Sequence, residues 1–118
     1  MASAELSGMD CEPCRGGIAP MERIKAERYL DNIPGWSLGG DPLRVERTFK
    51  FKDFLEAQTF AGMVGTLSEV QEHHPEIRYG YGYVAVSYWT HKIGGLHEND
   101  FIMAAKVQEI ADALNLAP

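Results

Sequence analysis

The fold is decided in the stretch Glu69-Val70-Gln71-Glu72-His73-His74-Pro75-Glu76, where a predicted helix gives way to a predicted strand. Glu69 and His73 are four residues apart, so on a regular helix they lie on one side, a turn from each other. Pro75 lacks an N–H and disfavours helical dihedrals at His74. The stretch therefore predicts a helix over residues 53–74 that ends at the histidine pair.

Further titratable side chains follow in the next thirty or so residues. The next apolar run is expected to be a strand that ends at Thr90-His91, and a new helix is expected to open around Asn99-Asp100. A helix end, a strand end and a helix start can meet at the rim of one pocket. The candidate catalytic side chains at this rim are Glu69, His73, His74, His91 and Asp100. Imidazole and carboxylate groups gathered in this way indicate proton transfer.

The central predicted helix has one apolar face. At about 100° per residue, its core-facing residues fall on one contiguous arc. These residues are Ala57, Phe60, Met63, Val64, Leu67 and Val70. Glu69 and His73 project just outside one edge of the arc, which predicts positions at a pocket rim. His74 projects into the middle of the arc, so it is predicted to be either a core histidine or a pocket wall.

The rest of the pattern predicts two hairpins and two further helices. In chain order these are a helix over 20–31, strands at 36–38 and 43–51, two strands within 77–90, and a helix over 99–114. The predicted order is α-β-β-α-β-β-α. It describes an α+β domain, in which a four-stranded antiparallel sheet has helices packed on one face.

Composition excludes several classes of function. The chain has 118 residues, which suits one domain with its own core. Its formal net charge of −6 argues against a nucleic-acid surface, because such surfaces cluster Lys and Arg. No apolar run approaches the ~20 residues that span a bilayer, and the first residues lack the apolar centre of a signal peptide. We therefore expect a cytoplasmic protein that binds neither nucleic acid nor membrane.

Residues 1–17 are rich in Ser, Gly and Ala and show no hydrophobic period. They are expected to form a flexible N-terminal tail that precedes a single domain over 18–118. Cys11 and Cys14 lie in this segment, with the spacing of half a zinc site or of a redox pair. No second Cys pair or nearby His completes a zinc site, and no predicted strand precedes the pair. Two reduced thiols are therefore expected.

Several short motifs from Pro34 to Leu114 stand in a specific order. They are Pro34-Gly35-Trp36, Phe49-Lys50-Phe51-Lys52-Asp53-Phe54, Glu69 with His73-His74-Pro75-Glu76, Thr90-His91, and Gly95-Leu96 with Asp100. Together they resemble the pterin-4a-carbinolamine dehydratase family, also called the 4a-hydroxytetrahydrobiopterin dehydratases. The intervals between His74, His91 and Asp100 agree with that family without gaps. The family's α+β fold agrees with the fold predicted above.

The resemblance implies a lyase that dehydrates 4a-hydroxytetrahydropterin to quinonoid dihydropterin, without a cofactor, and so supports tetrahydrobiopterin recycling. It implies these catalytic residues: His73, His74, His91, Glu69 and Asp100. It implies these substrate-binding residues: Trp36, His74 and Thr90. We expect His73, supported by Glu69, to be one proton-transfer group and His91 to be the other. His74 would then orient the pterin, although the roles of His73 and His74 are exchangeable at this point.

One position departs from the family pattern. The family usually has Ser or Thr directly after Gly95-Leu96, where this chain has His97. This position is the expected N-cap of the last helix. We therefore expect a weaker cap here, and with it a shifted loop beside Asp100.

Two other functions fit parts of the pattern. Three histidines and an aspartate are ligands that zinc accepts, but the adjacent His73 and His74 would point about 100° apart on a regular helix. The other alternative is a protein-binding or dimerisation module, or a transcriptional coactivator. Mammalian members of the resembling family also act as dimerisation partners of a homeodomain transcription factor. Zinc content and co-purification of a stoichiometric partner protein would discriminate these functions.

The predicted sheet also bears on assembly. It leaves two edges with unpaired N–H and C=O groups, which invite pairing with a second copy. The aromatic stretch from Tyr79 to Trp89 carries more apolar surface than a small monomer readily covers. Members of the resembling family form dimers or tetramers built from dimers. We therefore expect a homodimer or homotetramer, which light scattering at micromolar concentration would test.

Overall fold

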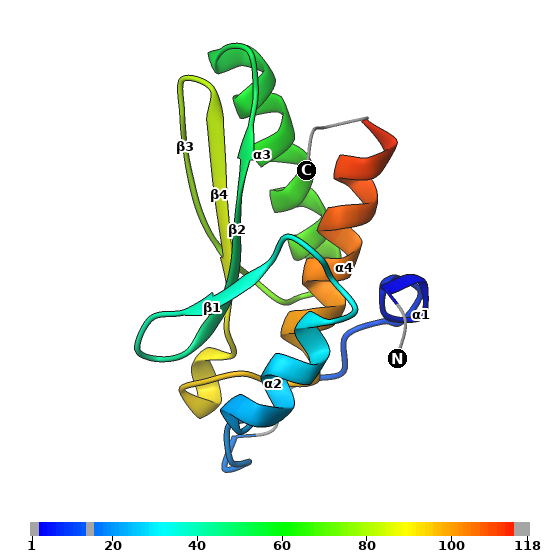
Figure 1. Cartoon of the computed structure of the whole chain (residues 1–118), viewed down its shortest axis with the longest axis vertical. Coiled ribbons are helices and arrows are strands. Elements are labelled where there is room, and N and C mark those ends of the chain that lie inside the picture. Colours follow the sequence, from blue (N-terminus) through cyan, green and yellow to red (C-terminus); the bar gives the residue numbers. More distant parts are fainter. Residues whose placement is uncertain (1–2, 14–15, 115–118) are drawn as a thin grey trace.

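The computed structural model describes residues 3–13 and 16–114 (Figure 1). Its elements, in chain order, are α1 (Ser3–Ser7), α2 (Arg23–Leu30), β1 (Ser37–Gly39), β2 (Arg44–Lys50), α3 (Phe54–Val70), β3 (Glu76–Gly80), β4 (Tyr83–Tyr88), the 3₁₀ turn η1 (His91–Ile93) and α4 (Glu98–Ala113). None of the helices in this described part is long and apolar enough to cross a membrane. Both predicted hairpins and all three predicted helices are present, within a few residues of their expected bounds.

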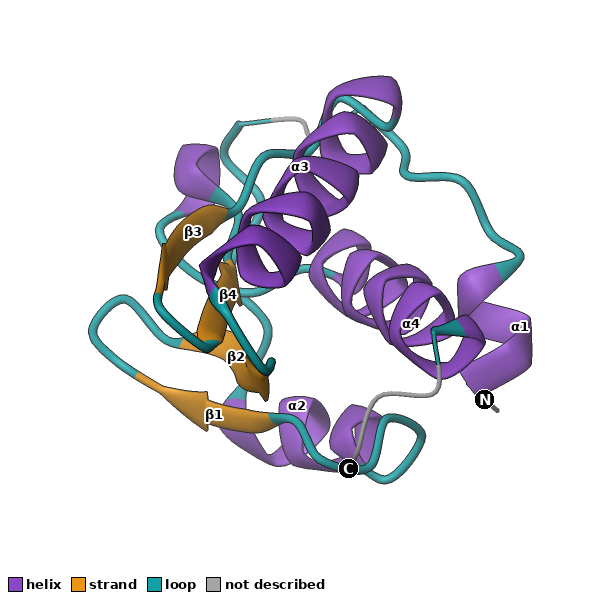
Figure 2. Cartoon of the chain, turned by 90° about the horizontal axis from the view of Figure 1, so that it is seen from above, coloured by secondary structure: helices purple, strands orange, loops and turns teal. Residues whose placement is uncertain are grey.

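The four strands form one antiparallel sheet in the order β1-β2-β4-β3. Val45 of β2 lies opposite Tyr88 of β4, and Ile77 of β3 lies opposite Val86. Helices α3 and α4 lie against one face of this sheet (Figure 2). The predicted fold class, α+β with helices on one face of a four-stranded antiparallel sheet, is therefore confirmed.

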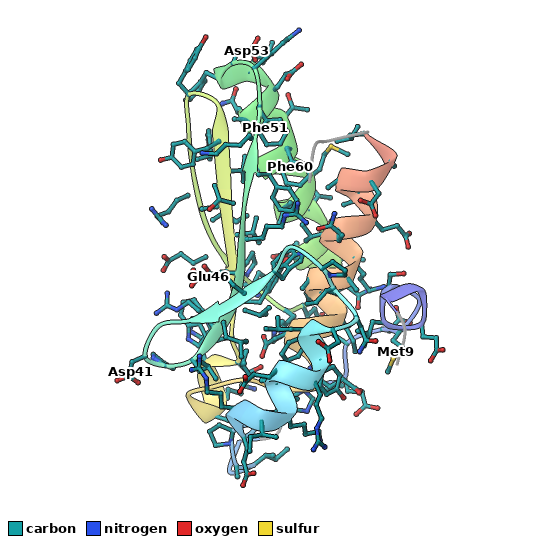
Figure 3. All side chains as sticks on the ribbon, viewed as in Figure 1. Met9, Asp41, Glu46, Phe51, Asp53 and Phe60 are labelled. Atoms are coloured by element: carbon teal, nitrogen blue, oxygen red, sulfur yellow. The ribbon has the colours of Figure 1, made fainter. Side chains whose placement is uncertain are left out.

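Helix α3 begins where its sequence supplies a cap. Asp53 precedes the helix in an extended conformation, and its carboxylate accepts a hydrogen bond from the Glu56 N–H at 2.9 Å. Phe60, two turns further on, packs against Phe49 and Phe51, with ring centroids 4.9 and 5.2 Å away. These contacts attach the helix to the end of β2, and Figure 3 labels Phe51 and Phe60.

The buried face of α3 differs in part from the predicted arc. Val64, Phe60 and Ala57 are buried as expected, but Met63 is 38% exposed and Val70 is 73% exposed. Ala61 and Ser68 are buried in addition. Small side chains such as these fit where the helix lies close to the sheet. The predicted arc omitted Ser68 because its side chain carries a polar hydroxyl. The buried face is therefore rotated from the one that hydrophobicity alone predicts.

The end of α3 also differs from the prediction. The helix ends at Val70, and Glu72 takes a left-handed conformation with φ 54°. The His73 N–H donates to the Ser68 carbonyl at 3.1 Å, which closes the turn. The predicted extension to residue 74 is therefore wrong, because the chain leaves the helix two residues before the histidine pair and not at Pro75.

Residues 6–13 of the N-terminal segment make contacts with the rest of the domain, although a flexible tail is expected over residues 1–17. Leu6 of α1 is fully buried, and α1 lies beside α4 (Figure 2). The Ser7 hydroxyl donates to Glu109 at 2.7 Å, and the Lys106 ammonium donates to the Ser7 carbonyl at 2.8 Å. A single apolar residue produces no hydrophobic period, so no local pattern predicts this long-range contact. Cys14 lies outside the described residues.

Replacing Leu6 by Ala tests whether this segment is docked. Burial of Leu6 predicts a loss of about 2–5 kcal/mol in the free energy of unfolding, measured by urea denaturation. Ile18→Ala is the control, because Ile18 is 44% exposed and its truncation should change stability by less than about 0.5 kcal/mol. Equal, small effects of both substitutions would mean that α1 does not pack on α4 in solution.

Candidate active site

Three separate parts of the chain line one cavity of about 330 Å³. They are the N-terminal segment, the turn after α3, and the end of β4 with the start of η1. The described lining residues are Cys11, Glu12, Pro13, Gln71, Glu72, His73, His74, Trp89, Thr90, His91 and Lys92. The three histidines singled out from the sequence are thus brought together at one cavity. Its volume falls at the lower end of the range for small-molecule sites.

Asp100 lies behind His73 and is fully buried at the start of α4. Its carboxylate receives three hydrogen bonds, from His73 Nε2 at 2.5 Å, from the Thr90 hydroxyl at 2.9 Å and from the His97 N–H at 2.9 Å. An ionised carboxylate only accepts hydrogen bonds, so this arrangement places a proton on His73 Nε2. In the neutral imidazole with this tautomer, the lone pair is on Nδ1.

The start of α4 is held by His97. The Nδ1 atom of its ring accepts a hydrogen bond from the backbone N–H of Asn99 at 3.0 Å, while the backbone N–H of His97 donates to the carboxylate of Asp100. This is a capping box with an imidazole in place of a hydroxyl. The expectation of a weaker cap rested on the absence of Ser or Thr, and in the structure His97 supplies a capping acceptor in their place. The cap also orients Asp100.

His73 is held on another side by Tyr88. The two rings lie nearly parallel, 11° apart, with centroids 6.1 Å from each other. Ser68 donates to the Val64 carbonyl at 2.8 Å, so the Tyr88 hydroxyl, 2.7 Å from Ser68 Oγ, is the donor in their contact. Burial raises the pKa of Tyr88 and keeps the phenol neutral. The support from Ser68 and Tyr88 is not visible in the sequence, where each resembles an ordinary core or helix residue.

His74 lies on the exposed side of the site. Its Nε2 is 2.7 Å from Glu69 Oε1, and both side chains are largely exposed. The expected support of His73 by Glu69 is therefore wrong, and Glu69 pairs with His74 instead. The reason is the left-handed turn at Glu72, which breaks the helical spacing on which that expectation rested. The sequence predicted that His74 is either a core histidine or a pocket wall. The structure shows that it is a wall of the cavity and not a core residue.

His91 follows the sheet at the start of η1 and is exposed. Its ring lies 4.4 Å from the ring of Trp89, and the guanidinium of Arg44 lies 4.4 Å from the same indole. Trp89 thus contacts both the cation of β2 and the histidine of the cavity. This aromatic contact limits the movement of a side chain that otherwise projects into solvent.

Of the predicted substrate-binding residues, Thr90 and His74 line the cavity and Trp36 does not. Trp36 is 6% exposed and belongs to the hydrophobic core, where its ring lies 6.0 Å from that of Phe49. Its indole N–H donates to Gln108 at 2.9 Å. The structure therefore corrects the expectation for Trp36, because the strand that follows Gly35 turns the indole toward α4.

Metal ligation was the alternative chemistry for the histidines. Among residues 3–13 and 16–114, no three His, Cys, Asp or Glu side chains lie together in a way that would hold a metal ion. His73 and His74 instead point to separate carboxylates, Asp100 and Glu69. Their divergence follows from their adjacent positions on an extended segment.

Cys11 contributes a neutral group to the cavity. Burial raises the pKa of its thiol from 9.0 to about 11. The thiol can donate a hydrogen bond to the backbone carbonyl of Asn99, which lies 3.8 Å from Sγ. The thiolate, which is the reactive form, is therefore scarce near neutral pH.

This pKa predicts the pH dependence of alkylation at Cys11. In a Cys14→Ser background, the rate of iodoacetamide labelling should keep rising as pH increases toward about 11, because the raised pKa delays formation of the thiolate. Mass spectrometry of the labelled peptide provides the measurement. A rate that reaches its plateau by pH 9 would show that the thiol is not buried, and free glutathione provides the reference profile.

Several known proteins are similar to this chain in sequence. The family model described as pterin 4 alpha carbinolamine dehydratase matches residues 19–110. A protein of Cupriavidus pinatubonensis with a provisional pterin-4-alpha-carbinolamine dehydratase name is 52% identical over 109 residues, which cover 92% of this chain and 94% of that protein. A protein of Methylococcus capsulatus with the same kind of name is 50% identical, with 94% and 97% covered.

Two solved structures are also similar. A structure from Brucella melitensis, described as a transcriptional coactivator/pterin dehydratase, matches with a TM-score of 0.71 and 33% identity, covering 78% of this chain and 98% of that one. A pterin dehydratase-like protein described as a RuBisCO assembly factor in the alpha-carboxysome matches with a TM-score of 0.57 and 25% identity, covering 67% and 92%.

Proposed function

The chain belongs to the pterin 4 alpha carbinolamine dehydratase family, and from this premise we propose that it dehydrates 4a-hydroxytetrahydropterin to quinonoid dihydropterin. The reaction removes water from the substrate. A base takes a proton from a ring nitrogen, the nitrogen's electrons form a C=N bond, and the C4a–O bond breaks as an acid protonates the departing hydroxyl. Two proton-transfer groups at one cavity are therefore the minimum requirement.

The observation that carries this proposal is the pairing of His73 with Asp100 beside a cavity that His91 also lines. Asp100 holds the proton on Nε2, so Nδ1 of neutral His73 has the lone pair that a base needs. We assign His73 to abstraction of the ring proton. His91 lies on a different segment and has no carboxylate partner within the described residues, so we assign it to protonation of the hydroxyl.

His74 and Glu69 are assigned to substrate orientation. Their hydrogen bond fixes the imidazole at the exposed side of the cavity, where it can contact the pterin without acting on C4a. Thr90 has a supporting role, because its hydroxyl is bonded to Asp100. Positioned acid–base groups of this kind supply about 10²–10⁴-fold acceleration, which suits a dehydration that also proceeds without an enzyme.

An assay of the carbinolamine in the presence of chelator tests this function. The purified protein should accelerate dehydration of freshly generated 4a-hydroxytetrahydropterin, and excess EDTA should leave the rate unchanged, because His73 and His91 carry the protons. A rate that is lost with EDTA and restored by zinc would contradict the assignment. Buffer with imidazole at the same concentration as the enzyme's histidines is the control for free general acid–base catalysis.

A second candidate function is a protein-binding role. It is favoured by the descriptions of the similar structures as a coactivator and as an assembly factor, and by the exposed apolar side chains Leu55 and Val70 on α3. A stoichiometric partner that binds the wild-type chain and not a Leu55→Asp variant would establish this role. The histidines at the cavity do not require it, so dehydration remains the primary proposal.

A further inference from the structure

The N-terminal segment supplies part of the cavity wall, although it precedes the region matched by the family model, residues 19–110. Cys11, Glu12 and Pro13 all line the cavity. Glu12 and Pro13 also line a second cavity, together with Ile18 and His97. The segment thus borders both cavities, and the histidines line the first of them.

Hydrogen bonds fix the backbone of this wall. The Glu12 N–H donates to Asn99 Oδ1 at 3.0 Å, and Asn99 Nδ2 donates to the Glu12 carbonyl at 2.6 Å. The Cys11 N–H donates to Gln71 Oε1 at 2.9 Å, and Gln71 Nε2 donates to Asp10 at 3.1 Å. Asn99 is 2% exposed, so its amide is dedicated to this contact.

Asn99 and Gln71, the two side chains that bind this wall, lie close in the sequence to the buried His73–Asp100 pair. Asn99 directly precedes Asp100, and Gln71 lies two residues before His73. The wall is therefore attached to the same two elements that carry the buried His73–Asp100 pair. Any substrate placed against His73 is bounded by this segment.

The carboxylate of Glu12 is available to a ligand. Glu12 is exposed and lines the cavity, and within residues 3–13 and 16–114 its carboxylate takes part in no hydrogen bond or ion pair. The backbone, in contrast, is bonded on both sides to Asn99. A fixed backbone with a free carboxylate reduces the ordering that ligand binding would require.

A pterin presents a matching surface. Its 2-amino group and N3–H lie side by side on the pyrimidine ring as two parallel donors, and a carboxylate accepts two such bonds at once. This edge is remote from C4a. Glu72 also lines the cavity and offers a second carboxylate, so the experiment below compares the two residues.

We infer that Glu12 is a specificity-determining residue that binds the 2-amino and N3–H edge of the pterin. The N-terminal segment then completes the substrate pocket from outside the family's matched region. Cys11, which is a neutral thiol next to Glu12, adds no charge that would compete with the carboxylate. This inference rests on the proposed function.

Binding of two stable probes tests it without turnover. 6-Methylpterin has the 2-amino donor, whereas 6-methyllumazine has a 2-oxo acceptor that would face the carboxylate. The wild-type protein should bind the pterin at least about tenfold more tightly than the lumazine, measured by fluorescence titration. In Glu12→Gln this ratio should fall by about tenfold or more, because an amide can donate to the 2-oxo group and accept from N3–H.

Two variants serve as matched controls. Glu5→Gln makes the same chemical change on the N-terminal segment at an exposed residue that does not line the cavity, and it should leave the ratio unchanged. Glu72→Gln removes the other carboxylate of the lining. A ratio that is kept in Glu12→Gln, or one that is lost only in Glu72→Gln, would overturn the inference.

The outcome separates this inference from the proposed function. If the wild-type protein binds 6-methylpterin and dehydrates the carbinolamine while Glu12→Gln keeps the wild-type ratio, only the role of Glu12 fails. If the wild-type protein binds neither probe, the proposed pterin site fails and the inference fails with it.

Discussion

Replacing Asp100 by Asn is expected to lower kcat for dehydration by about 10²-fold or more. The carboxylate accepts from three donors and places the proton on His73 Nε2. An amide presents only one oxygen acceptor, so His73 loses its single preferred tautomer and the lone pair on Nδ1 is no longer assured. The shape of the side chain is preserved, which separates this effect from loss of packing. Steady-state rates with fresh carbinolamine provide the measurement.

The matched control for this change is Asp112→Asn on the same helix. Asp112 is exposed and accepts from Gln108, so kcat should stay within a factor of about two. Asp100→Ala should also lower the free energy of unfolding by at least about 3 kcal/mol, because several buried donors lose their acceptor at about 1–3 kcal/mol each. An Asp100→Asn protein with wild-type kcat would show that the His73–Asp100 pair is purely structural.

The second large effect concerns the division of labour among the histidines. His73→Ala and His91→Ala should each lower kcat by about 10²-fold or more, because each removes a proton-transfer group. His74→Ala should mainly raise KM, because its hydrogen bond to Glu69 places it at the exposed side of the cavity as an orienting group. Complete kinetic curves for the three variants provide the measurement.

His97→Asn is the control, since it removes the fourth histidine but retains a side-chain cap for α4. Its kcat should remain close to that of the wild-type protein. A loss of kcat confined to His74→Ala would mean that the Glu69–His74 pair performs the chemistry and that the roles of the two adjacent histidines are exchanged. Small and equal effects of all three substitutions would remove the acid–base assignment.

The overall fold followed from local signals that the structure confirms. The apolar face predicted within 53–74 and the strand patterns at 36–51 and 77–90 each have a short-range physical cause, and together they predict the order of the elements. The meeting of His73, His74 and His91 also followed, because the ends of the elements that carry them lie at one end of the sheet. Patterns of this kind depend only on neighbours along the chain.

The details of the site depended on contacts that no local pattern contains. The left-handed backbone conformation of Glu72 changes the directions in which His73 and His74 point. Glu69 therefore pairs with His74 and not with His73. The packing of Leu6 on α4 turned an expected tail into the wall that carries Glu12. Trp36 was placed by its hydrogen bond to Gln108, which lies 72 residues further along the chain. Each of these outcomes is set by long-range contacts or by a single backbone conformation.

The central claim is that His73, held by Asp100, removes a proton from the substrate at this cavity. Stopped-flow absorbance of freshly generated 4a-hydroxytetrahydropterin tests it most directly, with increasing concentrations of wild-type protein and of His73→Ala. The account predicts a first-order rate constant that rises in proportion to the wild-type concentration and stays close to the uncatalysed value for His73→Ala. Equal slopes for the two proteins, or no rise with wild-type protein, would contradict it.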